Sequence, residues 1–300
     1  MKKRTVLVIV GSTASGKSAI AIKLAKKLNG EIISADSRQV YKGLDIGTGK
    51  VTNKEMAGVP HHLLDVIDFN KQFTVSDFKK LAENKIEEIL KKDKLPIVVG
   101  GTGFYIDSLT GLRSFSDVSV NKKLRKELES KSAEYLYKLL QKKDPRRSKE
   151  IDKNNKVRII RALEIIETLG KVPRTKASKP KYKFVYMGIK IPKEKLELKI
   201  LKRLTNRINQ GMIEEARWLH KKGLSFKRMD QLGLEYRYLA KYLKKEISNK
   251  QLVDLLYKEI KSYAKRQMTW FKANKKIKWF SPNEFKKIEK YVKGEFGGHK

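Results

Sequence analysis

The sequence predicts an α/β protein, in which a parallel sheet carries helices on both faces and is interrupted by a helical insertion. Three observations predict this fold. Short β-branched apolar runs stop at glycine-rich turns, helical segments with one apolar face follow these turns, and a polar, basic stretch separates the early apolar runs from the later ones. Strands that alternate with helices in this way form parallel sheets that are covered on both faces.

Each core element follows from its pattern of apolar residues. Residues 5–10 form a short, mostly β-branched apolar run that stops at glycine, which is typical of a buried strand. A helix is predicted over residues 19–28, because Ile20, Leu24 and Leu28 share one face and Asn29-Gly30 ends it. The other predicted elements are strands over 31–35, 95–99, 184–189 and 277–280, a helix over 73–90, a helix beginning at Phe104, and helices within 193–273.

Changes of composition along the chain predict its segments. Residues 120–170 are polar, basic and helical, and residues 170–180 form a linker that contains Lys, Pro and Ser. We therefore assign residues 1–115 to the first part of the core and 116–180 to a basic helical insertion. Residues 181–293 are the returning core with its C-terminal helices, and residues 294–300 are a frayed tail.

Net charge and the absence of Cys limit the classes of protein. The 300 residues include 70 Lys and Arg against 33 Asp and Glu, a formal net charge of +37. This excess favours a polyanionic partner and a monomer in the absence of RNA, although a general enrichment in Lys would also produce it. A chain without Cys has no disulfide, thiolate zinc site or cysteine nucleophile, which suits the cytosol. Its longest apolar run, residues 6–10, is far below the ~18 residues that span a bilayer, so we expect a soluble cytoplasmic protein without a membrane segment.

A phosphate-binding loop is predicted between the first strand and the first helix. Its residues fit the pattern G-x-x-x-x-G-K-[ST] and are Gly11, Ser12, Thr13, Ala14, Ser15, Gly16, Lys17 and Ser18. The backbone N–H groups of such a loop surround a diphosphate at the helix N-terminus. Lys17 adds a positive charge, and the Ser18 hydroxyl can bind Mg²⁺. The motif predicts a P-loop core that binds a di- or triphosphate, without specifying ATP.

Two further turns are expected at the same edge of the sheet, where the carboxyl ends of parallel strands meet. Asp36 follows the second strand, and its carboxylate can bind Mg²⁺ through water, accept a proton from a nucleophile, or cap a turn. Gly100-Gly101-Thr102-Gly103 follows the third strand. The glycines allow a ligand to approach the backbone and Thr102 offers a hydroxyl, although a tight strand-to-helix turn uses the same residues.

Three other features have a functional and a structural interpretation. His61-His62 lacks neighbours at metal-ligand spacing, which favours a structural role. Arg158 and Arg161 share one helix face in the insertion. A second basic face combines cations with aromatic residues, as RNA-binding surfaces do, but it also fits a solvated face over an aromatic core. It contains Lys258, Lys261, Tyr263, Lys265, Trp270, Phe271 and Lys272.

Taken in order, these motifs resemble the tRNA dimethylallyltransferase (IPP transferase) family, whose members prenylate an adenine beside the anticodon. The resemblance covers about residues 4–280. It rests on the phosphate-binding loop together with segments 36–48 (DSRQVYKGLDIGT), 59–65 (VPHHLLD), 100–103 (GGTG), 161–164 (RALE) and 265–271 (KRQMTWF). The sequence departs from the family's usual pattern at Ser12, Val157 and Arg207, where Pro, Gln and Met are usual, and around Gly233.

The resemblance implies a reaction and a set of site residues. The enzyme would transfer a dimethylallyl group from dimethylallyl diphosphate, bound with Mg²⁺, to the N6 amine of the adenine 3′ of the anticodon in tRNA. Asp36 would be the general base, and Lys17, Thr102 and Arg203 would stabilise the departing diphosphate. Residues matching tRNA-binding positions are Asp36, Ser37, Arg38, Gln39, Thr102, Arg125, Val157, Arg158, Ile159, Ile160 and Arg161.

Two other functions fit part of the sequence. The phosphate-binding loop alone favours a kinase of a small molecule or nucleoside, which would consume ATP and ignore tRNA. The charge alone also fits an RNA-binding protein that uses a nucleotide as a switch. Asp36-Ser37-Arg38-Gln39, placed directly after the second strand, favours group transfer over both.

Overall fold

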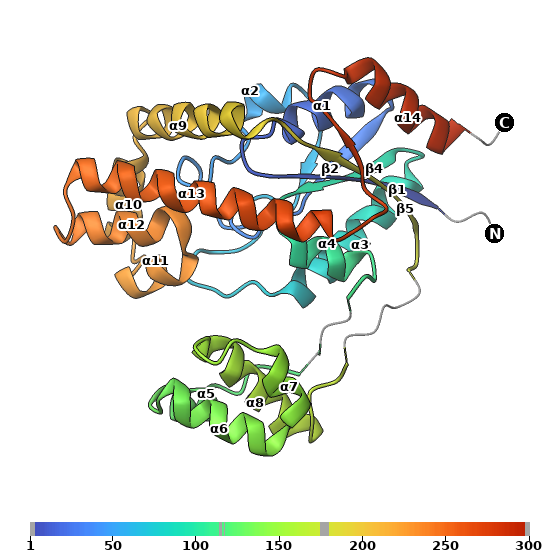
Figure 1. Cartoon of the computed structure of the whole chain (residues 1–300). Helices are drawn as coiled ribbons and strands as arrows, with labels where there is room; N and C mark the ends of the chain where they lie inside the picture. The colour runs from blue at the N-terminus through green and yellow to red at the C-terminus, as the bar shows by residue number, and fades with distance from the viewer. Residues whose placement is uncertain (1–3, 114–115, 117, 175–179, 298–300) are drawn as a thin grey trace. The chain divides into compact units, whose positions relative to one another are not determined.

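In the computed structural model, parallel strands form one sheet in the order β3-β2-β4-β1-β5-β6 (Figure 1). The structure describes residues 4–113, 116, 118–174 and 180–297. The prediction of a parallel sheet is confirmed, and the sheet gains one strand that was not predicted, the His61-His62 pair. The strands are β1 (Thr5–Gly11), β2 (Gly30–Ser34), β3 (His61–His62), β4 (Leu95–Gly100), β5 (Lys183–Ile189) and β6 (Lys278–Phe280).

Helices cover both faces of this sheet, as predicted (Figure 1). On one face α1 (Lys17–Lys27) and α14 (Phe285–Gly297) share an apolar core with the strands, to which Leu24 and Ile288 contribute. The other face carries α3 (Val75–Lys91) and α4 (Gly103–Leu109), where the rings of Phe78 and Tyr105 stack with centroids 4.2 Å apart. The short helix α2 (Asn53–Met56) lies between β2 and β3 in the chain.

A second apolar core lies among the C-terminal helices. Val40, Tyr41 and Leu44, which follow β2, pack into this core and so join the helices to the sheet. The longest of these helices, α13, also contacts β1 and α4. The helices are α9 (Lys193–Asn209), α10 (Met212–Lys221), α11 (Phe226–Leu232), α12 (Leu234–Leu243) and α13 (Asn249–Lys272).

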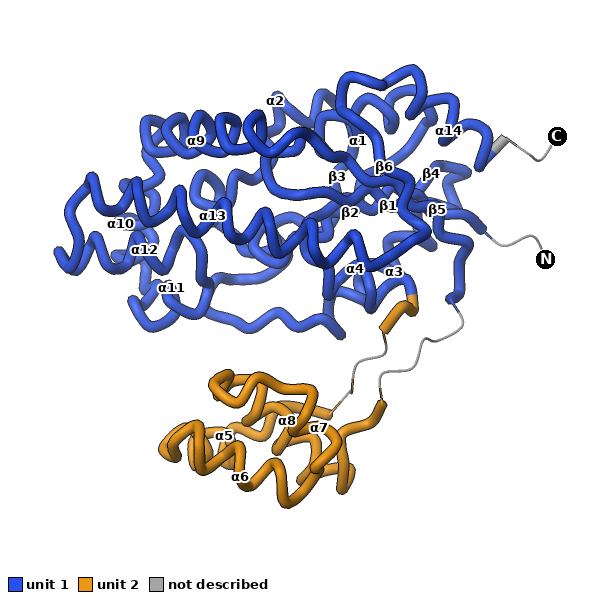
Figure 2. Tube along the Cα trace, viewed as in Figure 1, with its two compact units in different colours: residues 1–110, 179–300 blue, residues 111–178 orange. Residues whose placement is uncertain are grey.

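The insertion forms a compact unit of its own, residues 111–178, and the other unit comprises residues 1–110 and 179–300 (Figure 2). Capping side chains begin its helices, for example Asn121 at α5 and Ser132 at α6. Leu136, Leu140 and Leu163 are buried in its separate core. Its helices are α5 (Lys122–Glu129), α6 (Ala133–Lys143), α7 (Pro145–Glu150) and α8 (Lys156–Leu169).

The C-terminal end of the chain corrects one expectation. Helix α14 continues to Gly297, so residues 294–297 are helical rather than frayed. The physical reason is that Phe296 packs against the core shared by α1 and the strands, which stabilises the last turn of the helix. Residues 298–300 of the predicted tail lie outside the described residues.

None of the helices in the described ranges combines the length and the apolar composition that crossing a membrane requires.

The central position of β1 leads to a stability prediction. Leu7 is fully buried in β1, so Leu7→Ala should lower the free energy of unfolding by about 2–5 kcal/mol through lost burial and a residual cavity. Leu198 on α9 is 69% exposed, and the same substitution there should change stability by less than about 0.5 kcal/mol. Urea unfolding followed by circular dichroism measures both. Equal losses for the two variants would contradict the packing of β1.

Candidate active site

A cavity of about 660 Å³ lies where β1, β2 and β4 end. The carboxyl ends of parallel strands are where α/β sheets bind their ligands. Side chains from segments far apart in the sequence line this cavity. They include Thr13, Lys17 and Ser18 near the end of β1, Asp36, Arg38 and Gln39 after β2, Arg203 of α9, and Tyr263 and Gln267 of α13.

The loop at residues 11–18 connects β1 directly to α1, as predicted. Gly16 has a φ of +90°, a conformation that side chains disfavour, and it begins α1 so that the helix N-terminus faces the cavity. The Lys17 ammonium donates to the Ser12 carbonyl at 3.2 Å and folds back over the loop. Such a loop combines backbone donors, a helix N-terminus and a cation, which together suit a diphosphate.

The environment of Lys17 shifts the pKa of its ammonium group. Burial lowers the pKa of its ammonium to about 8, since removal from water disfavours the charged form. The carboxylate of Asp36 opposes this effect, and the guanidinium of Arg203 adds to it. An anion bound beside Lys17 would stabilise its protonated form, so binding of an anion and protonation of Lys17 are coupled.

Asp36 is held in a tight turn after β2. Its Oδ1 accepts hydrogen bonds from the backbone N–H groups of Arg38 at 2.9 Å and Gln39 at 3.4 Å. The backbone therefore fixes one oxygen of a carboxylate that lines the cavity. Ordered backbone donors on one oxygen leave the other available to accept a proton from a substrate.

Thr102 and Ser37 stabilise the same turn. Thr102 Oγ1 accepts from the Ser37 backbone N–H at 3.0 Å and donates to the Ser37 hydroxyl at 3.4 Å, and Thr102 N–H donates to the Ala35 carbonyl at 3.2 Å. Thr102 and Ser37 are not part of the cavity wall, whereas Asp36 is. In this structure the Thr102 hydroxyl positions the residues beside Asp36.

Arg203 reaches the 11–18 loop from α9. One guanidinium nitrogen, Nη1, donates to Thr13 Oγ1 at 3.3 Å, and the other, Nη2, donates to the Gly49 carbonyl at 2.9 Å. Burial lowers the pKa of Arg203 and the neighbouring Arg207 adds to this shift, but an arginine remains protonated at neutral pH. The tertiary structure thus places two cations, Lys17 and Arg203, in one cavity with Asp36.

Gln267 of α13 joins two of the loops, a role that the sequence analysis missed. Its Oε1 accepts from the Thr13 backbone N–H at 2.8 Å, and its Nε2 donates to the Gly101 carbonyl at 2.9 Å. A Cβ on residue 101 would lie 2.1 Å from Nε2, so glycine is needed for this approach. Gln267 lies in segment 265–271, which contributes to the family resemblance. The sequence did not show that its side-chain amide contacts both loops.

The residues predicted to bind tRNA in the insertion fall into three groups. Arg125 donates through Nε and Nη2 to the carboxylate of Glu164, at 3.2 and 2.6 Å, and Arg161 lies 3.5 Å from the same buried carboxylate. Val157 is 78% exposed and Arg158 is also exposed at the start of α8. The side chains of Ile159 and Ile160 are buried in the core of the insertion, which keeps them from direct contact with RNA.

The second basic face is similarly divided. Phe271 is buried, Tyr263 lines the cavity, and Lys261 lies 3.5 Å from Glu197 while its ammonium sits over the ring of Tyr257. Lys258, Lys265 and Lys272 are exposed. The face is therefore partly core and partly solvated.

The oxygen atoms in the cavity are compatible with Mg²⁺. Ser18 and Asp36 line the same cavity and supply a hydroxyl and a carboxylate. Groups of three or more His, Cys, Asp or Glu that could hold a metal are absent from the described part of the chain. Mg²⁺ retains several waters and binds through one or two protein oxygens together with substrate phosphates, so this donor set fits it. His61 also lines this cavity, and its Nδ1 is 2.8 Å from the Val59 carbonyl. His62 Nε2 is 2.7 Å from the buried carboxylate of Glu31.

Comparison with known proteins assigns the chain to a family. Residues 39–274 match the family model described as IPP transferase. The chain belongs to the IPP transferase family. It is 41% identical to a tRNA dimethylallyltransferase of Acetivibrio thermocellus, over 96% of this chain and 95% of the relative. It is also 43% identical to tRNA dimethylallyltransferase 2 of Treponema denticola, over 92% and 96% of the two chains.

Solved structures of the family share the fold. The tRNA isopentenylpyrophosphate transferase of Bacillus halodurans matches with a TM-score of 0.74 and 35% identity, over 99% of this chain and 97% of the other. A eukaryotic dimethylallyltransferase acting on tRNA matches with a TM-score of 0.80 and 27% identity, over 93% of this chain and 74% of that chain. These family members therefore share the α/β fold with the chain over nearly its whole length.

The lowered pKa of Lys17 predicts a pH dependence of donor use. Below about pH 8 Lys17 is protonated and can bind a diphosphate, and the charge is lost as pH rises through that value. We expect kcat/KM for the prenyl diphosphate, which reports the free enzyme, to fall above about pH 8. Lys17→Arg should remove this decline, because arginine stays charged. A decline that persists in Lys17→Arg would assign it to another group.

Proposed function

We propose that this protein transfers a dimethylallyl group from dimethylallyl diphosphate to the N6 amine of the adenine immediately 3′ of the anticodon in tRNA. One observation carries the proposal: in a chain of the IPP transferase family, Asp36, Lys17 and Arg203 line a single cavity. The relatives named tRNA dimethylallyltransferase and the eukaryotic structure acting on tRNA support the same reaction.

The geometry suggests a role for each of these residues. The N6 nitrogen attacks C1 of the allyl group, the N–C bond forms as the C1–O bond breaks, and the electron pair leaves with the diphosphate. Asp36 accepts the proton that the amine loses. Lys17 and Arg203 line the cavity and, with N–H groups of the 11–18 loop, would stabilise the negative charge that develops on the diphosphate. Such preorganised donors stabilise the transition state without further rearrangement.

Mg²⁺ is proposed to bind with the diphosphate through the Ser18 hydroxyl and, through water, the Asp36 carboxylate. When bound, it neutralises part of the negative charge of the diphosphate.

The RNA partner is supported by charge and by surface composition. A net charge of +37 attracts a polyanion, and binding would release counterions from the phosphates. Because an adenine must reach the Asp36 carboxylate inside a cavity, the target base would have to leave the stack of the anticodon loop. Arg38 and Gln39 line the same cavity, so they are suited to contact the base, while exposed Val157 and Arg158 are available to RNA in the insertion.

The first test is the reaction itself. Purified protein is incubated with Mg²⁺, dimethylallyl diphosphate and unmodified tRNA with adenine 3′ of its anticodon, and the digested RNA is analysed by mass spectrometry. We expect a five-carbon addition to that adenine. Asp36→Asn should lower kcat by ~10²–10⁴-fold, the range for loss of a general base. Asp93→Asn, at an exposed position that does not line the cavity, is the matched control and should retain activity. ATP consumption without prenyl transfer would favour a kinase.

The second test concerns the charge. The logarithm of the tRNA association constant should fall linearly with the logarithm of salt concentration, with a slope of about −0.7 to −0.9 per phosphate contact. Filter binding between 50 and 200 mM KCl measures the slope. A complex whose affinity does not change with salt would contradict an electrostatic role for the excess cations.

A further inference from the structure

A half-buried carboxylate outside the cavity holds the loop that follows β2. Glu215 of α10 accepts hydrogen bonds from three consecutive backbone N–H groups: those of Asp45 at 3.0 Å and Ile46 at 2.7 Å reach Oε2, and that of Gly47 at 2.8 Å reaches Oε1. Consecutive N–H groups around one anion form a tight concave site, so this carboxylate fixes the local backbone. Glu215 itself is absent from the cavity wall.

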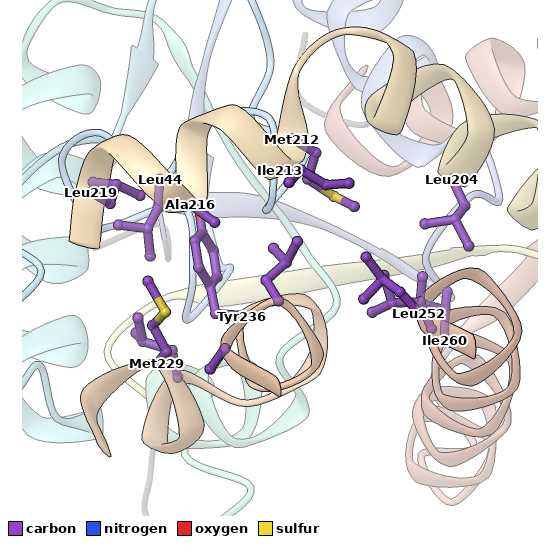
Figure 3. Packing of buried hydrophobic residues seen from close by; sticks show 14 of the residues in the cluster. Leu44, Leu204, Met212, Ile213, Ala216, Leu219, Met229, Tyr236, Leu252 and Ile260 are labelled. Carbon is purple, nitrogen blue, oxygen red and sulfur yellow. The ribbon is translucent and has the colours of Figure 1, made fainter. Parts of the chain in front are cut away.

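Two buried side chains, those of Tyr236 and Arg207, act with Glu215 to hold the loop, and the three residues are called the clamp. The Tyr236 hydroxyl donates to Glu215 Oε1 at 2.7 Å, and its ring is packed near Ala216 of α10 and Met229 of α11 (Figure 3). Arg207 Nη1 donates to the Gly47 carbonyl at 2.8 Å, and its Nη2 lies 2.9 Å from Glu235. Gly47 is therefore held at its N–H by Glu215 and at its carbonyl by Arg207. A Cβ on residue 47 would lie 2.7 Å from the Tyr236 hydroxyl, so the packing requires glycine there.

Gly49, at the other end of this loop, accepts hydrogen bonds from two residues that line the cavity. The Gly49 carbonyl accepts from Arg203 Nη2 at 2.9 Å and from Gln39 Nε2 at 3.3 Å. Gly49 has a φ of +60°, and a Cβ there would lie 2.1 Å from Arg203 Nη2, so the backbone and the guanidinium are in direct contact. Only Thr48 separates Gly47 from Gly49, so a shift of the backbone at Gly47 is passed on to Gly49 and its hydrogen bonds.

We propose that Glu215 is a positioning residue, which fixes the 44–49 loop so that the Gly49 carbonyl holds Arg203 against the diphosphate site and Gln39 at the cavity wall. This inference rests on the proposed function, because it assigns the diphosphate of the prenyl donor to Lys17 and Arg203. Glu215 would thus affect the affinity for the prenyl donor, although it contacts neither the donor nor the tRNA.

The chemistry of the clamp requires a carboxylate. A Gln side chain has the same shape, but its NH₂ group would face a backbone N–H in either orientation of the amide, since three N–H donors surround the two oxygens. Glu215→Gln therefore releases at least one end of the loop while leaving the volume of the side chain nearly unchanged. The neighbouring Glu214 is exposed, so Glu214→Gln makes the same change of charge without touching the loop.

The experiment measures donor binding without RNA. Isothermal titration calorimetry with dimethylallyl diphosphate and Mg²⁺ gives the dissociation constant of each variant below its unfolding temperature. We expect Glu215→Gln to weaken binding by about 10–100-fold, the effect of losing a hydrogen bond to a charged group, and Glu214→Gln to match the wild type. Gly49→Ala, which displaces Arg203 directly, should weaken donor binding similarly. The affinity for tRNA should change much less in all three variants. A purely structural role for Glu215 would lower the unfolding temperature and leave donor affinity unchanged.

A double-mutant cycle tests whether Glu215 acts through Arg203. Lysine cannot form the paired contacts of the guanidinium with Thr13 and Gly49, so Arg203→Lys should make donor binding insensitive to a second change at Glu215. Additive effects, or normal donor affinity in a folded Glu215→Gln protein, would overturn the inference while leaving the proposed function intact. Wild-type protein that binds no prenyl diphosphate would overturn both.

Discussion

The amide of Gln267 fixes the geometry on which the cavity depends. Loops that leave the carboxyl ends of parallel strands expose backbone N–H and C=O groups, and a buried group without a partner is costly. Gln267 provides an acceptor for Thr13 and a donor for Gly101, so one side chain satisfies both loops and ties them to α13. The distance between the 11–18 loop and the turn that supports Asp36 is thereby set by a helix more than 160 residues away in the chain.

Buried charge is the second constraint on the site. Lys17 and Arg203 occupy one cavity with Asp36 as a nearby anion, and burial disfavours both cations. Arg207 adds a third buried cation, which is balanced by Glu235 at 2.9 Å. An anionic substrate would relieve the electrostatic cost of the two cavity cations, so the site is best stabilised when a diphosphate is bound. The net charge of +37 favours a much larger polyanion through long-range electrostatic attraction.

The insertion shows how an identical residue type can serve structure or binding. Arg125 and Arg161 both contact the buried carboxylate of Glu164, which would otherwise be an uncompensated charge in the core of the insertion. Val157 and Arg158 on the first turn of α8 are exposed, whereas Ile159 and Ile160, which follow directly, are buried. The family resemblance matches all of these positions to tRNA binding, which stays a prediction, and the structure adds which of the side chains are exposed and which also hold a buried carboxylate.

From the sequence alone one could predict five of the six strands in the described residues, the loop at 11–18, the turn at Asp36 and the helical insertion, because these depend on local apolar periodicity, glycine and capping residues. The sequence also placed Lys17 and Asp36 at one edge of the sheet, since parallel strands share that edge. Only the tertiary structure decided that Thr102 supports the turn beside Asp36, that Gln267 joins two loops, and that Glu215 reaches the N–H groups of the 44–49 loop. Those contacts join segments far apart in the chain, and their geometry depends on how α10 and α13 pack, which local patterns do not specify.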